Sequence, residues 1–191
     1  MSKQDKRDEI LRAALELIAE HGFHGAPMAM IAERAGVGAG TIYRYFENKD
    51  VLINELYLEL ENKMFPCLLD GYEEQHTIRG RFIHLSTALF RYFIAYPLDF
   101  RYLEQFFNSP YGAALRREKL LGERKKGDLF CNLLQEGAAQ QVLKDLPLTV
   151  LAAMAFGPLL YVARDHILGF ITLDDQLIER TVEACWDGLK R

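Results

Sequence analysis

The sequence predicts an all-α protein of about nine helices, with a three-helix helix-turn-helix domain at its N-terminus and a larger helical domain after it. Apolar residues recur three and four positions apart along most of the 191 residues, which is the period of an amphipathic helix. The alternation that is typical of strands is almost absent. Half of the residues are hydrophobic and 26% are charged, the balance of a soluble globular protein.

The first three helices are predicted to be short. The first is expected over residues 5–20, where apolar residues form one face, and Gly22 is expected to end it in a left-handed conformation. A second helix is expected over 28–35 and a third over 39–46.

About six further helices are expected in the rest of the chain. Asn48 is placed to cap a long fourth helix, and Thr172 or Asp174 could cap the last one. Glycine, proline and polar residues predict the intervening breaks, which fall near Gly71, His76, Tyr96-Pro97, Ser109-Pro110, Gln141 and Gly169.

Three spacings within residues 28–46 favour a helix-turn-helix. Ala32 stands four residues before Gly36, and Gly36 stands six before Ile42. A small residue lets two short helices cross closely, and a glycine accepts the positive φ that the tight turn needs. Ile42 and Phe46, four residues apart, would then bury against the preceding helix.

The outer face of the third helix is predicted to enter the major groove of double-stranded DNA. Thr41 can contact a base edge or a thymine methyl group, and Arg44 can pair with a phosphate or a guanine. Tyrosine hydroxyls can donate to phosphates. The candidate DNA-binding residues on this face are Gly40, Thr41, Tyr43, Arg44 and Tyr45.

Lys49 is expected in the first turn of the fourth helix, where a cation opposes the helix dipole. A phosphate bound there would favour the lysine, because it attracts both the helix amides and the ammonium group. A solvent-exposed lysine without such a role is the alternative. The net charge is −4 and the first fifty residues are nearly neutral, so a DNA contact has to come from a local patch.

Residues 7–57 resemble the TetR/AcrR family of transcriptional regulators, on the segments ILRAALELIAEHGF and IAERAGVGAGTIYRYFENKDVL. The resemblance implies that Tyr43 and Lys49 contact phosphates. It also implies a DNA-binding domain over residues 1–48 and a ligand-sensing and dimerisation domain over 49–191. The expected protein is a cytoplasmic homodimer that represses transcription from a palindromic operator until a small, hydrophobic effector releases it.

Two departures from the family pattern leave alternatives open. The second helix begins without a hydroxyl side chain, which removes a usual cap. Gly38-Ala39-Gly40 offers few side chains to read bases, so the operator is read partly by its shape or mainly by Thr41, Arg44 and Tyr45. An activator, or an interaction module of this fold with weak or no sequence-specific DNA binding, is an alternative function.

Ten of the 22 aromatic residues fall within residues 82–111, a density that could line an apolar ligand pocket. Simple filling of a helical core is the alternative, and polar residues such as Gln105 could orient a ligand. The candidate pocket residues are Phe65, His84, Phe90, Phe93, Tyr102, Phe106, Phe107, Tyr111 and Phe130.

The last two helices are expected to form the dimer interface, since small residues over 148–163 permit close helix approach and the final helix carries an apolar stripe. An intramolecular helix pair is the alternative. The candidate interface residues are Leu151, Ala155, Leu159, Val162, Ile178, Val182 and Trp186.

The sequence offers no catalytic constellation, so we expect no enzyme activity and no cofactor. Three widely separated cysteines do not suit a metal site. The longest uncharged run, 146–163, is short for a membrane span and contains two prolines, which favours a buried helix and no membrane partner.

Overall fold

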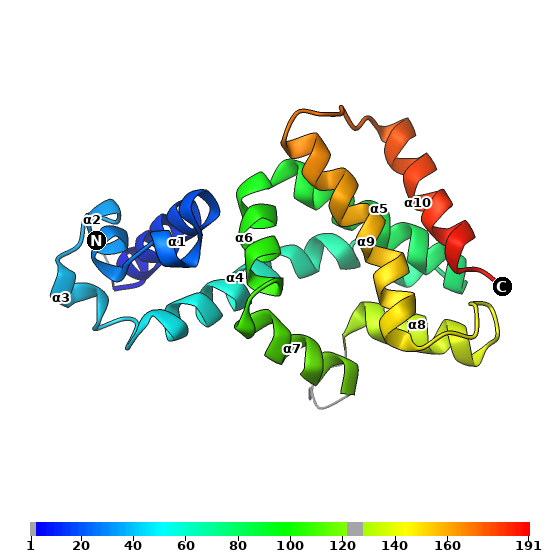
Figure 1. The fold of residues 1–191 in the computed structure, drawn as a ribbon, viewed down its shortest axis with the longest axis horizontal. Helices are drawn as coiled ribbons and strands as arrows, with labels where there is room; N and C mark the ends of the chain where they lie inside the picture. Colours follow the sequence, from blue (N-terminus) through cyan, green and yellow to red (C-terminus); the bar gives the residue numbers. More distant parts are fainter. Residues whose placement is uncertain (1–2, 122–127) are drawn as a thin grey trace. The chain divides into compact units, whose positions relative to one another are not determined.

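The computed structural model describes residues 3–121 and 128–191, and this part of the chain is helical, without strands (Figure 1). The all-α prediction is confirmed. The helices are α1 (Lys3–Gly25), α2 (Met28–Arg34), α3 (Ala39–Ile42), α4 (Lys49–Leu69), η1 (Tyr72–Glu74, a 3-10 helix), α5 (Ile78–Ala95), α6 (Pro97–Phe107), α7 (Pro110–Leu121), α8 (Leu129–Ala139), α9 (Leu148–Ile167) and α10 (Asp175–Leu189).

The described residues contain ten α-helices where about nine were predicted, because the segment predicted between residues 110 and 141 holds two of them. Asp128 caps α8, and its side chain accepts hydrogen bonds from the amides of Phe130 and Cys131, each at 3.1 Å. Aspartate is a preferred N-cap residue, so Asp128 is a sequence signal for this helix start.

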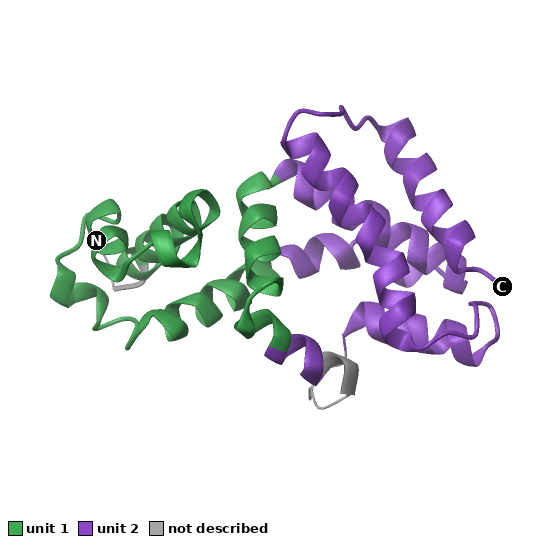
Figure 2. Cartoon of the chain, in the orientation of Figure 1, with its two compact units in different colours: residues 1–63, 96–113 green, residues 64–95, 114–191 purple. Residues whose placement is uncertain are grey.

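The chain forms two compact units (Figure 2). Unit 1 comprises residues 1–63 and 96–113, and unit 2 comprises 64–95 and 114–191. Unit 1 therefore joins α6 and the start of α7 to the N-terminal helices, although they lie far along the chain. The functional division at residue 48 stays a prediction.

In unit 1, α6 packs along α1, and α2 packs against both α1 and α3. The first helix is interrupted at Gly22, whose φ of 73° and ψ of 174° lie outside the helical region. The predicted positive φ of Gly22 is confirmed, but the chain resumes helical turns as far as Gly25. Tyr102 of α6 donates a buried hydrogen bond of 2.6 Å to the carbonyl of Ile53 on α4.

In unit 2, α5 is surrounded by α8, α9 and α10. Phe82 of α5 and Trp186 of α10 pack with ring centroids 5.6 Å apart. Arg81 binds Glu136 of α8 through two hydrogen bonds of 2.8 and 2.6 Å. The predicted Asp174 cap of α10 is confirmed, since its side chain accepts from the amide of Leu177 at 2.7 Å.

Helix α9 is long and apolar enough to cross a membrane by length and composition alone, a test that core helices of soluble proteins also pass. Its Leu151, Ala155, Leu159 and Ala163 form one buried face. The opposite face is exposed, so the prediction of a buried helix holds for one side only.

Candidate nucleic-acid interface

The turn between α2 and α3 has the predicted geometry. Gly36 adopts a φ of 64°, and the amide of Val37 donates to the carbonyl of Ala32 at 2.9 Å. A side-chain Cβ at Gly36 would meet open space, so the backbone conformation alone favours glycine there. Ala32, Ile42 and Phe46 are buried as expected.

Helix α3 ends at Ile42, four residues earlier than predicted. The chain nevertheless keeps turning, since the amides of Tyr45 and Phe46 both donate to the carbonyl of Ile42 at 3.0 Å. These bonds carry Phe46 back to the buried side, where the sequence pattern had placed it.

The predicted reading face is available to DNA. The side chain of Tyr43 is 55% exposed, Gly40 and Arg44 are also exposed, and Thr41 and Tyr45 are half-buried. A Cβ at Gly40 would meet nothing within 4 Å. Residues 38–40 therefore present backbone and the methyl group of Ala39, and the larger side chains that can reach a groove come from residues 41–45.

Lys49 has an unpredicted partner within the protein. Its ammonium group donates to the carbonyl oxygen of Phe23, in the last turn of α1. Burial lowers the pKa of Lys49, and the neighbouring Asp50 carboxylate opposes that shift. An ammonium group has three N–H donors, so this bond is compatible with a phosphate contact.

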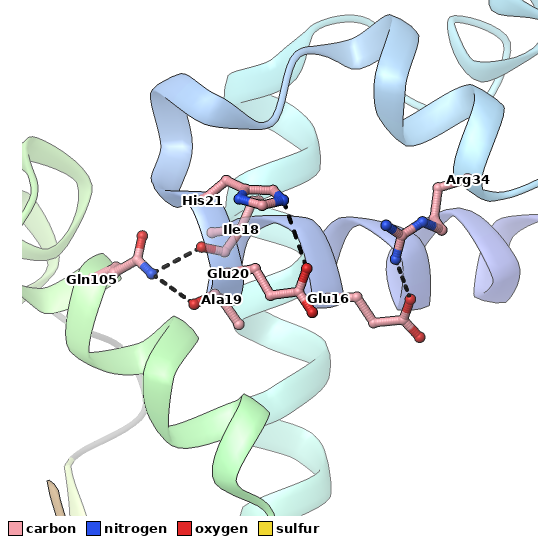
Figure 3. A network of polar contacts seen from close by, with 7 residues as sticks. All are labelled: Glu16, Ile18, Ala19, Glu20, His21, Arg34 and Gln105. Carbon is pink, nitrogen blue, oxygen red and sulfur yellow. Dashed lines mark hydrogen bonds and ion pairs between the residues drawn. The ribbon is translucent and has the colours of Figure 1, made fainter. Parts of the chain in front are cut away.

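The end of α1 is also held by α6 (Figure 3). The side-chain amide of Gln105 donates to the carbonyls of Ile18 at 2.8 Å and Ala19 at 3.5 Å. Gln105 was a candidate for orienting a ligand, but in the structure its side-chain amide is hydrogen-bonded to the helical turn that precedes Gly22. No local sequence signal pairs residues so far apart.

The aromatic ring of Phe23 lies against α6 and α7. It makes edge-to-face contacts with Tyr102, at 6.1 Å between ring centroids, and with Tyr111, at 5.8 Å. The Tyr111 hydroxyl donates to Asp50, and this hydrogen bond, with some burial, raises the pKa of Tyr111 to about 12. Asp50 therefore connects the start of α4 to the start of α7.

Four candidate pocket residues lie in unit 1. Tyr102 and Phe106 are fully buried, and Phe106 stacks on Tyr57 of α4 at 4.4 Å. These two rings therefore fill the core between α6, α1 and α4. Tyr111 is half-buried against Phe23, and Phe107 is 45% exposed.

The other five candidate pocket residues lie in unit 2. Phe90 and Phe93 are buried, whereas Phe65, His84 and Phe130 are half-buried. The imidazole of His84 lies 3.2 Å from the carbonyl of Leu68, and its ring packs against Tyr72. Phe130 packs edge-to-face on Phe156, at 4.7 Å between centroids. A pocket among these five residues stays a prediction.

The candidate dimer residues lie mostly in the interior of a single chain. Six of the seven are buried within one copy and Val162 is half-buried, and a dimer interface at these residues stays a prediction. The periodicity identified the apolar stripe of each helix, and that stripe packs within unit 2. The six buried residues are Leu151, Ala155, Leu159, Ile178, Val182 and Trp186.

The described residues contain no group of three or more His, Cys, Asp or Glu side chains that could hold a metal ion. A helix-turn-helix with exposed tyrosine and arginine side chains beside a helix N-terminus is the arrangement of a DNA-binding protein. Residues 10–56 match the family model of the bacterial regulatory proteins of the tetR family, and residues 78–190 match that of the tetracyclin repressor-like C-terminal domain. The chain belongs to the tetR family of bacterial regulatory proteins.

Relatives agree with this assignment. A TetR family protein from Vibrio parahaemolyticus is 31% identical, with a TM-score of 0.73 over 97% of this chain and 99% of its own. A TetR family transcription regulator from Marinobacter aquaeolei is 25% identical, with a TM-score of 0.83 over 98% and 97%. The fatty acid metabolism regulator protein of Bacillus subtilis is 35% identical over 79 residues, which cover 41% of each chain.

As a member of this family, the chain is a transcriptional regulator that binds DNA. The alternative of an interaction module without specific DNA binding is not favoured, since the matched relatives are transcriptional regulators.

Proposed function

We propose that this chain is a cytoplasmic, non-enzymatic repressor that acts as a dimer. The dimer binds a palindromic operator mainly through phosphate contacts near α3 and the start of α4. The observation that carries the proposal is that Tyr43 and Arg44 are exposed a few residues before Lys49, which begins α4. A bound phosphate there would meet the helix amides and the ammonium group of Lys49 together. Thr41, Arg44 and Tyr45 would read the bases, since residues 38–40 offer little beyond backbone.

Two-fold symmetry supports the proposed operator. The DNA-binding heads, residues 1–48 of each copy, are identical and therefore match the two half-sites of a palindrome. The surface we propose for the contact between copies is the exposed stripe of α9, opposite to its buried face. Its apolar members recur at helical spacing and are all exposed: Val150, Ala153, Leu160 and Tyr161, with the exposed Leu168 at the C-cap.

Tyr161→Glu tests this surface. Tyr161 is 64% exposed in the single chain, so a glutamate is tolerated in the monomer but would be desolvated between two copies. We expect a monomer by analytical ultracentrifugation and a loss of operator affinity on the order of 10²-fold, because one head then binds without the other. Leu58→Glu, at a comparably exposed apolar position on α4, is the control and should remain dimeric. A dimeric Tyr161→Glu protein would exclude this face.

The effector we propose is a small apolar molecule, with long-chain acyl compounds as the first candidates. Support comes from the aromatic residues of unit 2 and from the match to a fatty acid metabolism regulator. Selection of binding sites from random DNA, followed by titration of the complex with fatty acids and acyl-CoA esters of several lengths, tests both parts. Failure to enrich any sequence would contradict the repressor, and release by coenzyme A alone would contradict the apolar effector.

Lys49→Ala tests the phosphate contact. Each phosphate contact contributes about 0.9 to the slope of log affinity against log salt concentration, so a dimer that loses two contacts should show a slope shallower by roughly 1.8. Affinity should fall for operator and random DNA alike. Arg34→Ala removes one positive charge that is paired with Glu16 at 3.1 Å, and it should leave the slope unchanged (Figure 3). An unaltered slope in Lys49→Ala would rule out the contact.

A further inference from the structure

We propose that Phe23 is a positioning residue for DNA binding: its carbonyl oxygen orients Lys49, and its ring ties that orientation to α6 and α7. The inference rests on the proposed phosphate contact of Lys49. It adds a connection, within unit 1, between the phosphate-binding end of α4 and the two helices that lie against the end of α1.

The interruption at Gly22 places Phe23 for both tasks. The φ of 73° and ψ of 174° at Gly22 redirect the chain, and Phe23 is the first residue of the final turn of α1. Its carbonyl oxygen accepts a hydrogen bond from the Lys49 ammonium group. A lysine side chain has four rotatable bonds and loses much freedom when ordered, so a carbonyl that already holds it reduces the entropy cost of meeting a phosphate.

The ring of Phe23 is held from the other side by two tyrosines that are themselves anchored. Tyr102 is fixed by its hydrogen bond to the Ile53 carbonyl, and Tyr111 is fixed by its hydrogen bond to Asp50. Both rings meet Phe23 edge-to-face, with interplanar angles of 85° and 68°. Phe23 is therefore in contact with α6 and α7 through its ring and with α4 through its carbonyl oxygen.

The preceding turn of α1 is fixed to α6 as well, through the hydrogen bonds of Gln105 to Ile18 and Ala19 (Figure 3). A displacement of α6 relative to α1 would therefore move the Phe23 carbonyl away from Lys49. Lys49 would lose its partner while the helix-turn-helix itself remained folded.

Phe23→Leu is the test variant, because leucine keeps an apolar side chain but lacks the two ring contacts. We expect its operator-binding salt slope to become shallower by up to the same roughly 1.8 that Lys49→Ala shows. In the double variant Phe23→Leu/Lys49→Ala, the slope should equal that of Lys49→Ala alone, because both changes remove the same contact. Leu60→Val, a buried change three turns along α4 from Lys49, is the stability control and should keep the wild-type slope.

The outcomes separate this inference from the proposed function. A shallower slope in Lys49→Ala with a wild-type slope in Phe23→Leu would overturn the positioning role and leave the phosphate contact intact. An unchanged slope in Lys49→Ala would overturn both. Slope changes that add in the double variant would show that Phe23 acts independently of Lys49. If Phe23→Leu does not fold, Tyr111→Leu, which removes one of the two rings, should give a partial decrease, and a wild-type slope would overturn the inference.

Discussion

Phe46→Ala is expected to lower the free energy of unfolding by about 3–5 kcal/mol, the usual cost of removing a buried phenylalanine ring. Phe46 is fully buried and is the largest such side chain in the first 48 residues. The guanidinium group of Arg7 also lies 5.8 Å from its ring centroid. Because the N-terminal helices are short, few other apolar contacts can compensate for the cavity. Operator binding should be lost with the fold of the head.

Urea denaturation followed by circular dichroism measures this effect, with Tyr43→Ala as the matched control. Tyr43 belongs to the same segment, but its exposed ring should contribute to stability only within about 0.5 kcal/mol. Tyr43→Ala should therefore fold normally and bind DNA more weakly. A Phe46→Ala protein as stable as the Tyr43→Ala protein would contradict the packing described for the helix-turn-helix.

Gly22→Ala is expected to destabilise the chain by about 1–3 kcal/mol, because the φ and ψ of Gly22 lie in a region that only glycine adopts without strain. An added Cβ would also lie 3.3 Å from the side-chain oxygen of Gln105, which has little room to move while its amide nitrogen bonds α1. The variant should bind the operator less tightly as well, since the strain falls next to Phe23.

The control for Gly22→Ala is Gly40→Ala, whose Cβ would meet open space and whose φ is not positive. Alanine is also the better helix former, so Gly40→Ala should keep or slightly raise stability. Thermal unfolding of the two variants beside the wild type gives the comparison. Equal melting temperatures for all three would mean that the interruption of α1 does not persist in solution.

The local geometry of the candidate interface could be predicted because its signals lie within a few residues of one another. Gly36 has the positive φ that the turn requires, and Ile42 and Phe46 are buried at the spacing of one helical turn. Exposure of Tyr43 and Arg44 follows from the same periodicity. The early end of α3 could not be predicted. The amides of Tyr45 and Phe46 both donate to the carbonyl of Ile42, and no local sequence pattern indicates such a shared bond.

The contrast between Gly22 and α9 shows which features follow from local residue preferences and which depend on packing between distant segments. The positive φ of Gly22 and the apolar helix α9 could be predicted, since both follow from the conformational preferences of neighbouring residues. The hydrogen bond of Gln105 to Ile18, 87 residues away, could not be predicted. Neither could the orientation of α9, in which Leu151 and Ala155 face the core while Tyr161 faces outward. The physical reason is that periodicity identifies an apolar face, but the helix that covers that face is chosen by packing between distant segments.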